Sequence, residues 1–167
     1  MSNQSHPPGF YPVRRDRLLQ ERVHDSYQAK GKFHEPTYCP DCNAVFRAGR
    51  WQWLEHGNDA HPVTCPACHR ERDHFPAGYV SLSGDFLAEH NQEILHLIKN
   101  REAREKAGHP LQRIMDIETT DDDGVQVTTT DSHLARSIGV ALYHAYRGEL
   151  AFHYNPVQTL LRVKWSR

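Results

Sequence analysis

Residues 39–68 read CPDCNAVFRAGRWQWLEHGNDAHPVTCPAC, and this stretch specifies a fold more directly than any other part of the chain. It begins and ends with a C-P-x-C motif, and the two motifs contain all four cysteines among 167 residues. A C-x2-C turn brings two thiolates within reach of one ion, and two such turns complete a tetrahedral shell of four sulfurs. The spacing therefore predicts a zinc ribbon with a structural Zn2+ on Cys39, Cys42, Cys65 and Cys68.

The residues after the two motifs support this interpretation. Each is expected to adopt a left-handed backbone, so that amide N–H groups point at the sulfurs and each turn caps a short hairpin. Asn43 and His69 stand there, and both types are enriched among non-glycine residues at positive φ. Two disulfides are the alternative, but they suit a small secreted domain, and no signal peptide is evident. A closed shell of four sulfurs leaves no open coordination position, so we expect the metal to be structural and not catalytic.

Composition restricts the class of protein. Apolar residues make up 38% of the chain, and no apolar run approaches the ~18 residues that a membrane helix needs, so no membrane partner is expected. Four cysteines assigned to a metal, without an evident export signal, predict a reducing cytoplasm. The net charge of −1 argues against a dedicated nucleic-acid binder, but the bases gather towards both ends of the chain, so one face can still be basic.

The pattern outside the ribbon predicts an arm and one α+β domain. Residues 1–15 are expected to form a flexible basic arm, 16–35 a short helix and linker, and 36–76 the zinc ribbon. Residues 77–167 alternate as β-α-β-β-α-β with one extra C-terminal strand, which is the order of a ferredoxin-like split βαβ domain. Both helices are expected on one face of an antiparallel sheet.

Local signals within that domain are specific enough to test. Ser83 and Asp85 are candidate N-caps of the first helix, and Asp131 is the candidate N-cap of the second. Asp123-Gly124 predicts the turn between the two middle strands. The strand before this turn should carry on one face Leu111, Arg113, Met115 and Ile117. The second helix should bury Leu134, Ile138, Ala141, Leu142 and Ala145.

Basic residues interleaved with aromatic ones indicate contact with RNA. Arg47 and Arg50 lie beside Phe46, Trp51 and Trp53 in the ribbon, a mixture that suits phosphate contact and base stacking. The alternative is that Phe46 and one tryptophan cover the metal site. The N-terminal arm adds three further candidate contacts, Arg14, Arg15 and Arg17.

The outer face of the second helix shows a more regular pattern. Arg136, Tyr143 and Arg147 are spaced i, i+7 and i+11, so they project within roughly 40° of one another. His133 lies in the first turn of the same helix. These four residues are candidate RNA contacts, and a merely solvated face is the competing interpretation.

Motifs for catalysis are missing from the sequence. It contains no G-x4-G-K-[ST] phosphate loop, no G-x-S-x-G elbow and no H-E-x-x-H. With all four cysteines assigned to a metal, no thiol is left as a nucleophile. Asp121-Asp122-Asp123 precedes Gly124 and is typical of a solvated turn more than of a Mg2+ site. We therefore expect no enzyme activity and no small-molecule substrate.

The paired cysteines, the long helix, the hairpin and the sequence T-D-x-x-x-A-R-x-I at residues 130–138 resemble a known family. They are similar to the bacterial zinc-ribbon relatives of the large-ribosomal-subunit nuclear export adaptor, over about residues 36–165. The resemblance implies that the four cysteines bind zinc and that this region docks on the large ribosomal subunit. Longer relatives have more than one set of paired cysteines, whereas this chain has one. A weaker likeness, in the hairpin and the Thr-Asp-led helix, is to ribosome hibernation factors, which also bind rRNA.

The sequence thus favours a cytoplasmic, non-enzymatic zinc protein associated with the ribosome. It would bind ribosomal RNA, with ribosomal proteins as further partners, in hibernation, assembly or surveillance. The alternative is a protein-interaction module whose ribbon docks on another protein, for example in transcription or regulation.

Overall fold

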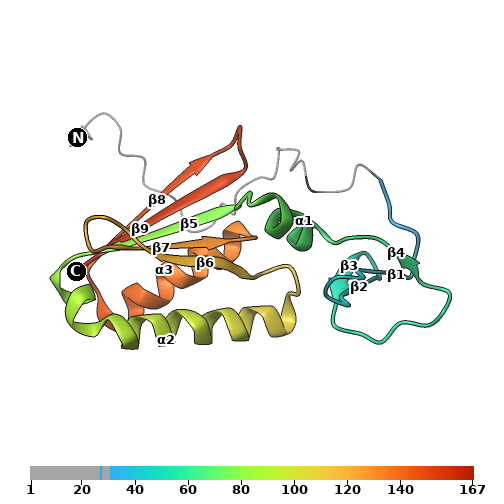
Figure 1. Ribbon diagram of the computed structural model, residues 1–167, viewed down its shortest axis with the longest axis horizontal. Helices are drawn as coiled ribbons and strands as arrows, with labels where there is room; N and C mark the ends of the chain where they lie inside the picture. The colour runs from blue at the N-terminus through green and yellow to red at the C-terminus, as the bar shows by residue number, and fades with distance from the viewer. Residues whose placement is uncertain (1–26, 28–30) are drawn as a thin grey trace, which may run out of the picture.

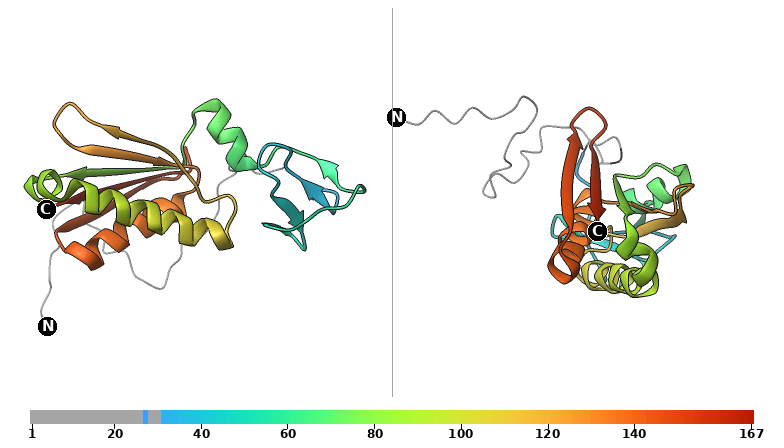
Figure 2. Two further views of the ribbon diagram at one scale, coloured as in Figure 1. Left: turned by 60° about the horizontal axis from the view of Figure 1, so that its bottom comes forward. Right: turned by 90° about the vertical axis from the view of Figure 1, so that its left-hand side faces the viewer.

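The computed structural model describes residue 27 and residues 31–167, which form an α+β structure with two sheets (Figure 1). The expected arm and almost all of the expected N-terminal helix lie outside the described residues. The small sheet lies at one end of the molecule and the large sheet forms the main body, with α1 between them (Figures 1 and 2).

The small sheet has four short strands in the order β3-β2-β1-β4. These are β1 (Thr37–Tyr38), β2 (Val45–Arg47), β3 (Arg50–Gln52) and β4 (His61–Pro62). Strands β1, β2 and β3 pair antiparallel, and β4 pairs parallel with β1. Helix α1 (Pro66–Asp73) follows and begins within the second cysteine motif.

The large sheet has five strands in the order β6-β7-β5-β9-β8. Its strands are β5 (Gly78–Ser83), β6 (Ile114–Thr119), β7 (Val125–Thr129), β8 (Glu149–Asn155) and β9 (Leu160–Ser166). The helices are α2 (Asp85–Gly108) and α3 (Ser132–Tyr146), and both cover the same face of this sheet, as expected (Figures 1 and 2).

The prediction of a fully antiparallel sheet was wrong for one pair of strands. Strand β9 lies between β5 and β8 and runs parallel to β5, so the extra strand is inserted in the sheet and is not added at its edge. Burial explains this placement. Val163 and Trp165 of β9 are fully buried, whereas most of β8 is exposed, as suits an edge strand. The element order was predicted correctly, but the sheet order was not deducible from it.

The core lies between the large sheet and its two helices. It combines Val80 and Leu82 of β5, Ile94 and Ile98 of α2, and the buried stripe of α3. Leu134, Ile138 and Leu142 are buried as expected, but Ala145 is exposed and Ala141 only partly buried. Ala135 and Gly139 are buried instead.

The difference follows from a close approach of α3 to the sheet at Gly139. A Cβ at this position would lie 2.5 Å from Cγ1 of Val163 on β9. Only glycine permits this contact, and it turns the 135–139 side of the helix towards the sheet.

Two further local expectations were wrong. Helix α2 has no side-chain cap from Ser83 or Asp85; its N-cap is Gly84, and the N–H of Phe86 donates to the carbonyl of Arg167 at 3.0 Å. A β-bulge shifts the register of β6 between Ile114 and Asp116. The bulge interrupts the simple alternation, so Ile114 and Ile117 both pack against the core. The Asp123 turn (φ 57°) and the Asp131 N-cap are confirmed.

Candidate metal centre and basic surfaces

The four cysteines lie together at the junction of the small sheet and α1. One sulfur from each residue falls within 4.8 Å of all the others, and none of them forms a disulfide. Sγ of Cys42 and Sγ of Cys65 are 3.8 Å apart. A tetrahedron of sulfurs about 2.3 Å from a central Zn2+ has edges of about 3.8 Å. The residues present therefore fit a metal ion held by four thiolates.

The first motif forms the turn between β1 and β2. The N–H of Asn43 donates to the carbonyl of Cys39 at 2.8 Å, and the N–H of Cys39 donates to the carbonyl of Ala44 at 2.8 Å. Asn43 has φ 62°, so the left-handed conformation expected after Cys42 is confirmed. This motif caps a hairpin, as the sequence predicted.

The second motif begins a helix, so the expectation of a second hairpin was wrong. Cys65 is the N-cap of α1 and its sulfur accepts from the N–H of Cys68 at 3.5 Å. Pro66 occupies the first helical position, where its fixed φ favours a helix and its missing N–H has no cost. His69 is therefore helical and not left-handed, and its N–H donates to the carbonyl of Cys65 at 3.0 Å.

Aromatic rings cover the sulfur cluster. Trp51 packs against the cysteines, and Phe46 contacts Trp51 with ring centres 5.6 Å apart. Phe33 lies edge-on to both rings. These contacts favour the covering role for Phe46 and Trp51. Trp53 is different, because it is exposed and its indole N–H donates to the carbonyl of Lys106 at the end of α2.

Arg113 contacts the sulfur cluster, although the sequence analysis did not name it as a site residue. It is only 6% exposed, and its Nη1 lies 3.3 Å from Sγ of Cys68 and 3.2 Å from a carboxylate oxygen of Glu71. Its Nη2 lies 3.6 Å from Sγ of Cys65, and its Nε donates to the carbonyl of Pro110 at 2.8 Å. The only sequence signal for this contact was the charge of Arg113, which lies on a predicted strand face whose other residues are apolar.

The charges of this cluster depend on one another. The hydrogen bond between Cys42 and Cys65 lowers the pKa of Cys42 to about 4 and raises the pKa of Cys65. Burial raises the pKa of Cys68 to about 11, and the Arg113 guanidinium opposes that rise. Burial by itself would lower the pKa of Arg113, but the Cys68 hydrogen bond and the cysteine charges raise it overall. Arg113 therefore stays cationic and stabilises thiolates, the form that binds a metal.

The residues predicted to contact RNA fall on two separate surfaces among the described residues. Arg136 of α3 lies over the ring of Phe152 on β8, with 5.2 Å from the guanidinium carbon to the ring centre. The guanidinium of Arg147 lies 5.6 Å from the ring centre of Tyr143. We call these four residues the α3–β8 surface. His133 lies at the start of the same helix, with Nδ1 3.5 Å from a carboxylate oxygen of Asp131.

The second surface is the tip of the β2–β3 hairpin. Arg47 and Arg50 are paired across the strands and are exposed. Between them, the N–H groups of Ala48 and Gly49 donate to the Glu35 carboxylate at 2.8 and 3.1 Å. The hairpin belongs to the small sheet and α3 to the large one, so the structure does not bring these arginines to the α3–β8 surface (Figure 1). Arg14, Arg15 and Arg17 lie outside the described residues.

Comparison of the chain with protein-family models, with curated proteins and with solved structures gave no match. The two family resemblances therefore remain predictions from the sequence. In the described part of the chain, no helix combines the length and apolar character needed to cross a lipid bilayer.

Proposed function

We propose that the protein is a non-enzymatic, zinc-stabilised RNA-binding factor whose target is ribosomal RNA. The metal would hold together a small sheet that buries little apolar surface of its own. The α3–β8 surface would contact RNA. The family resemblances suggest that this RNA is part of the ribosome.

Zinc is favoured over other metals by the type of ligand. Four thiolates in a tetrahedral arrangement are typical of zinc or iron–sulfur centres, and the 3.8 Å between the sulfurs of Cys42 and Cys65 suits a single Zn2+. Cys39, Cys42, Cys65 and Cys68 would hold it. Backbone N–H groups and Arg113 donate to the sulfurs, which offsets the charge of four thiolates on one divalent ion.

The observation that carries the RNA proposal is the pairing of two guanidiniums with two exposed rings on one surface. Tyr143 and Phe152 are 38% and 37% exposed, and each lies beside an arginine. A stacked guanidinium keeps its outward N–H groups free for phosphate, and the ring edge beside it can contact a base.

Co-sedimentation with purified ribosomes tests this proposal. At low salt the full chain should pellet with ribosomes, and Arg136→Ala with Arg147→Ala should move it towards the supernatant. The matched control is Lys99→Ala with Arg104→Ala, which removes the same charge from exposed positions of α2. A wild-type protein that stays in the supernatant at low salt would exclude the ribosome as its target.

The same experiment separates RNA binding from the alternative protein-interaction role. Binding through phosphates weakens steeply as salt rises, because counterions are released from the RNA. An apolar protein interface would keep the chain in the pellet across the same salt range. In that case, the exposed Trp53 and Leu54 of the small sheet's loop would become the candidate contacts.

A further inference from the structure

Helices α2 and α3 cover only one face of the large sheet (Figures 1 and 2), and the outward side chains of the opposite face, here called the open face, are exposed or half-buried. Outward residues of the three central strands β5, β7 and β9 form it. We define the open face as Tyr79, Ser81, Gln126, Thr128, Arg162 and Lys164. Neither Asp nor Glu occurs anywhere in these three strands. The centre of the face is therefore cationic although the whole chain is nearly neutral.

A tyrosine and an arginine meet at the middle of this face. Tyr79 of β5 and Arg162 of β9 are in register, and the guanidinium lies 4.8 Å from the ring centre. Lys164 follows two residues along β9, beside Ser81. Among residues 27 and 31–167, the Lys164 side chain has no hydrogen-bond or ion-pair partner, so its ammonium is available to a ligand.

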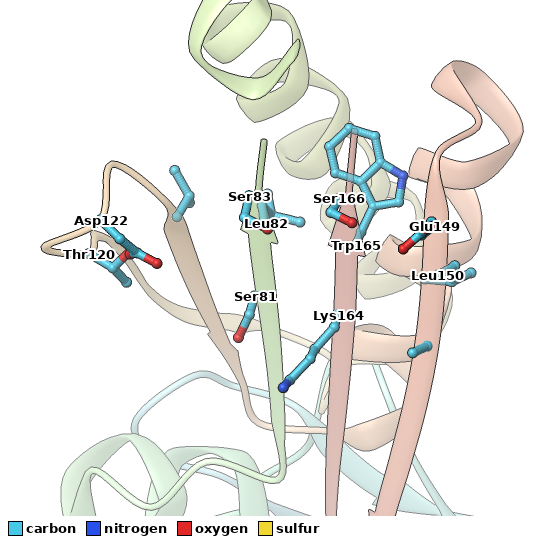
Figure 3. A pocket seen from close by; sticks show the side chains of 12 residues that line it. Ser81, Leu82, Ser83, Thr120, Asp122, Glu149, Leu150, Lys164, Trp165 and Ser166 are labelled. Carbon is cyan, nitrogen blue, oxygen red and sulfur yellow. The ribbon is translucent and has the colours of Figure 1, made fainter. Parts of the chain in front are cut away.

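The face is hollowed beside Lys164. The polar lining of a depression of about 610 Å3 includes Ser81, Ser83, Lys164 and Ser166, beside apolar residues such as Leu82 and Leu150. Figure 3 shows Lys164 leaning from β9 towards β5. Asp122 and Glu149 stand at opposite margins of this hollow (Figure 3). Asp116 and Glu118 border the face on the edge strand β6. Between these acidic margins, the two cations of the face are Arg162 and Lys164, both on β9.

We propose that the open face binds single-stranded RNA, with an unpaired base stacked on Tyr79 and Arg162 and a phosphate at Lys164. This inference rests on the proposed function and adds that the RNA bound at the open face is single-stranded. Sheet surfaces bind single strands when outward rings stack on splayed bases and cations contact the phosphates. The serine hydroxyls and the side chains of Gln126 and Thr128 provide donors and acceptors for base edges and for the ribose 2′-hydroxyl.

The open face adjoins the α3–β8 surface across a single edge strand. Phe152 of β8 faces the helix and pairs with Val163, whereas the next residue, His153, faces outward and pairs with Arg162. His153 is exposed. One RNA strand can therefore pass from Arg136 around the β8 edge to Arg162, which makes the two surfaces parts of one path.

Fluorescence anisotropy of the full chain with a labelled 12-nucleotide oligouridine tests the proposal. Tyr79→Ala should weaken binding at least about fivefold, whereas Tyr79→Phe, which keeps the ring, should bind like the wild type. Lys164→Ala should weaken binding and lower the slope of log K against log[salt] by about 0.7. Lys99→Ala, at an exposed position of α2, is the charge-matched control and should leave the affinity and the salt slope unchanged.

The outcomes distinguish this inference from the proposed function. If Tyr79→Ala binds oligouridine like Tyr79→Phe, the open face is not the site. If ribosomal RNA binds in a manner that depends on Arg136 and Arg147 but oligouridine does not bind, the inference fails while the proposed function stands. If the wild type binds neither RNA, both fail. An excess of a 12-base-pair RNA duplex should compete weakly, and full displacement by it would also overturn base stacking.

Discussion

The guanidinium of Arg113 donates to Sγ of Cys68 at 3.3 Å, although the two residues are 45 positions apart in the chain. Cys68 belongs to the metal cluster and Arg113 immediately precedes β6 of the large sheet. The N–H of Arg113 also donates to Oγ1 of Thr130, just after β7, at 3.0 Å. One buried residue therefore joins the cysteine cluster, through its side chain, to the large sheet, through its backbone N–H.

Replacing Arg113 should weaken metal binding. Arg113→Met keeps a long side chain but removes the donors to the sulfurs, and loss of such outer contacts typically costs about 10- to 100-fold in metal affinity. Competition with a chromophoric chelator measures the change. Arg72→Met is the control, because Arg72 is exposed and paired only with Asp41 among the described residues. Equal affinities for the two variants would mean that Arg113 has no influence on the metal.

Acidification should release the metal, and Arg113→Met should release it at a higher pH than the wild type. The metal binds thiolates, so protons compete with it as the pH falls. Burial raises the pKa of Cys68, and the Arg113 charge opposes that rise. Without this charge the thiol pKa increases further, and protons displace the metal earlier in the titration. A zinc-sensitive dye should detect zinc release from Arg113→Met at a higher pH than from the wild type. Release at the same pH from both proteins would contradict the prediction.

Removing a ligand should unfold the small sheet and leave the large one folded. Metal binding supplies apparent free energies of roughly 10–16 kcal/mol in small zinc modules, more than so few buried side chains contribute. In Cys39→Ser, hydrogen exchange should become fast over residues 37–73 and stay slow over β5 and β9. Metal analysis of the wild type should give one zinc per chain. Retained protection over 37–73 in metal-free protein would show that the metal is not needed there.

Gly139 should be intolerant of a side chain. A Cβ there would lie 2.5 Å from Cγ1 of Val163, and overpacking a core typically costs about 1–3 kcal/mol. Gly139→Ala should lower the free energy of unfolding by that amount in a denaturant titration. Gly108→Ala at the end of α2 meets nothing within 4 Å and should be neutral or slightly stabilising. Similar stabilities for the two variants would refute the close packing of α3 on β9.

Features set by neighbours in the sequence were predictable here, and features set by distant contacts were not. The four ligands, the Asp131 cap and the Asp123-Gly124 turn each depend on a few consecutive residues. The helical start after Cys65 was also local, and Pro66 at its first position was the signal that could have revealed it. By contrast, the insertion of β9 beside β5 and the placement of Arg113 against Cys68 depend on tertiary packing.

The candidate RNA contacts divide in the same way. Helical spacing correctly placed Arg136 and Tyr143 at exposed positions of α3, whereas Arg147 is the C-cap that ends the helix (φ 62°) and is also exposed. It gave no sign of Phe152, because this ring comes from a strand that follows the helix and packs beside it. The open face was also missed, since outward positions become a surface only when the sheet order is known.

The most direct test of the central claim is the salt dependence of binding to ribosomal RNA. For the wild type, log K should fall steeply with log[salt]. Arg136→Ala with Arg147→Ala should bind more weakly, with a slope lower by about 1.4 to 1.8, since two phosphate contacts are lost. Its stability should stay within about 0.5 kcal/mol of the wild type, because both positions are exposed. A folded double variant with unchanged affinity and unchanged slope would contradict RNA binding by the α3–β8 surface.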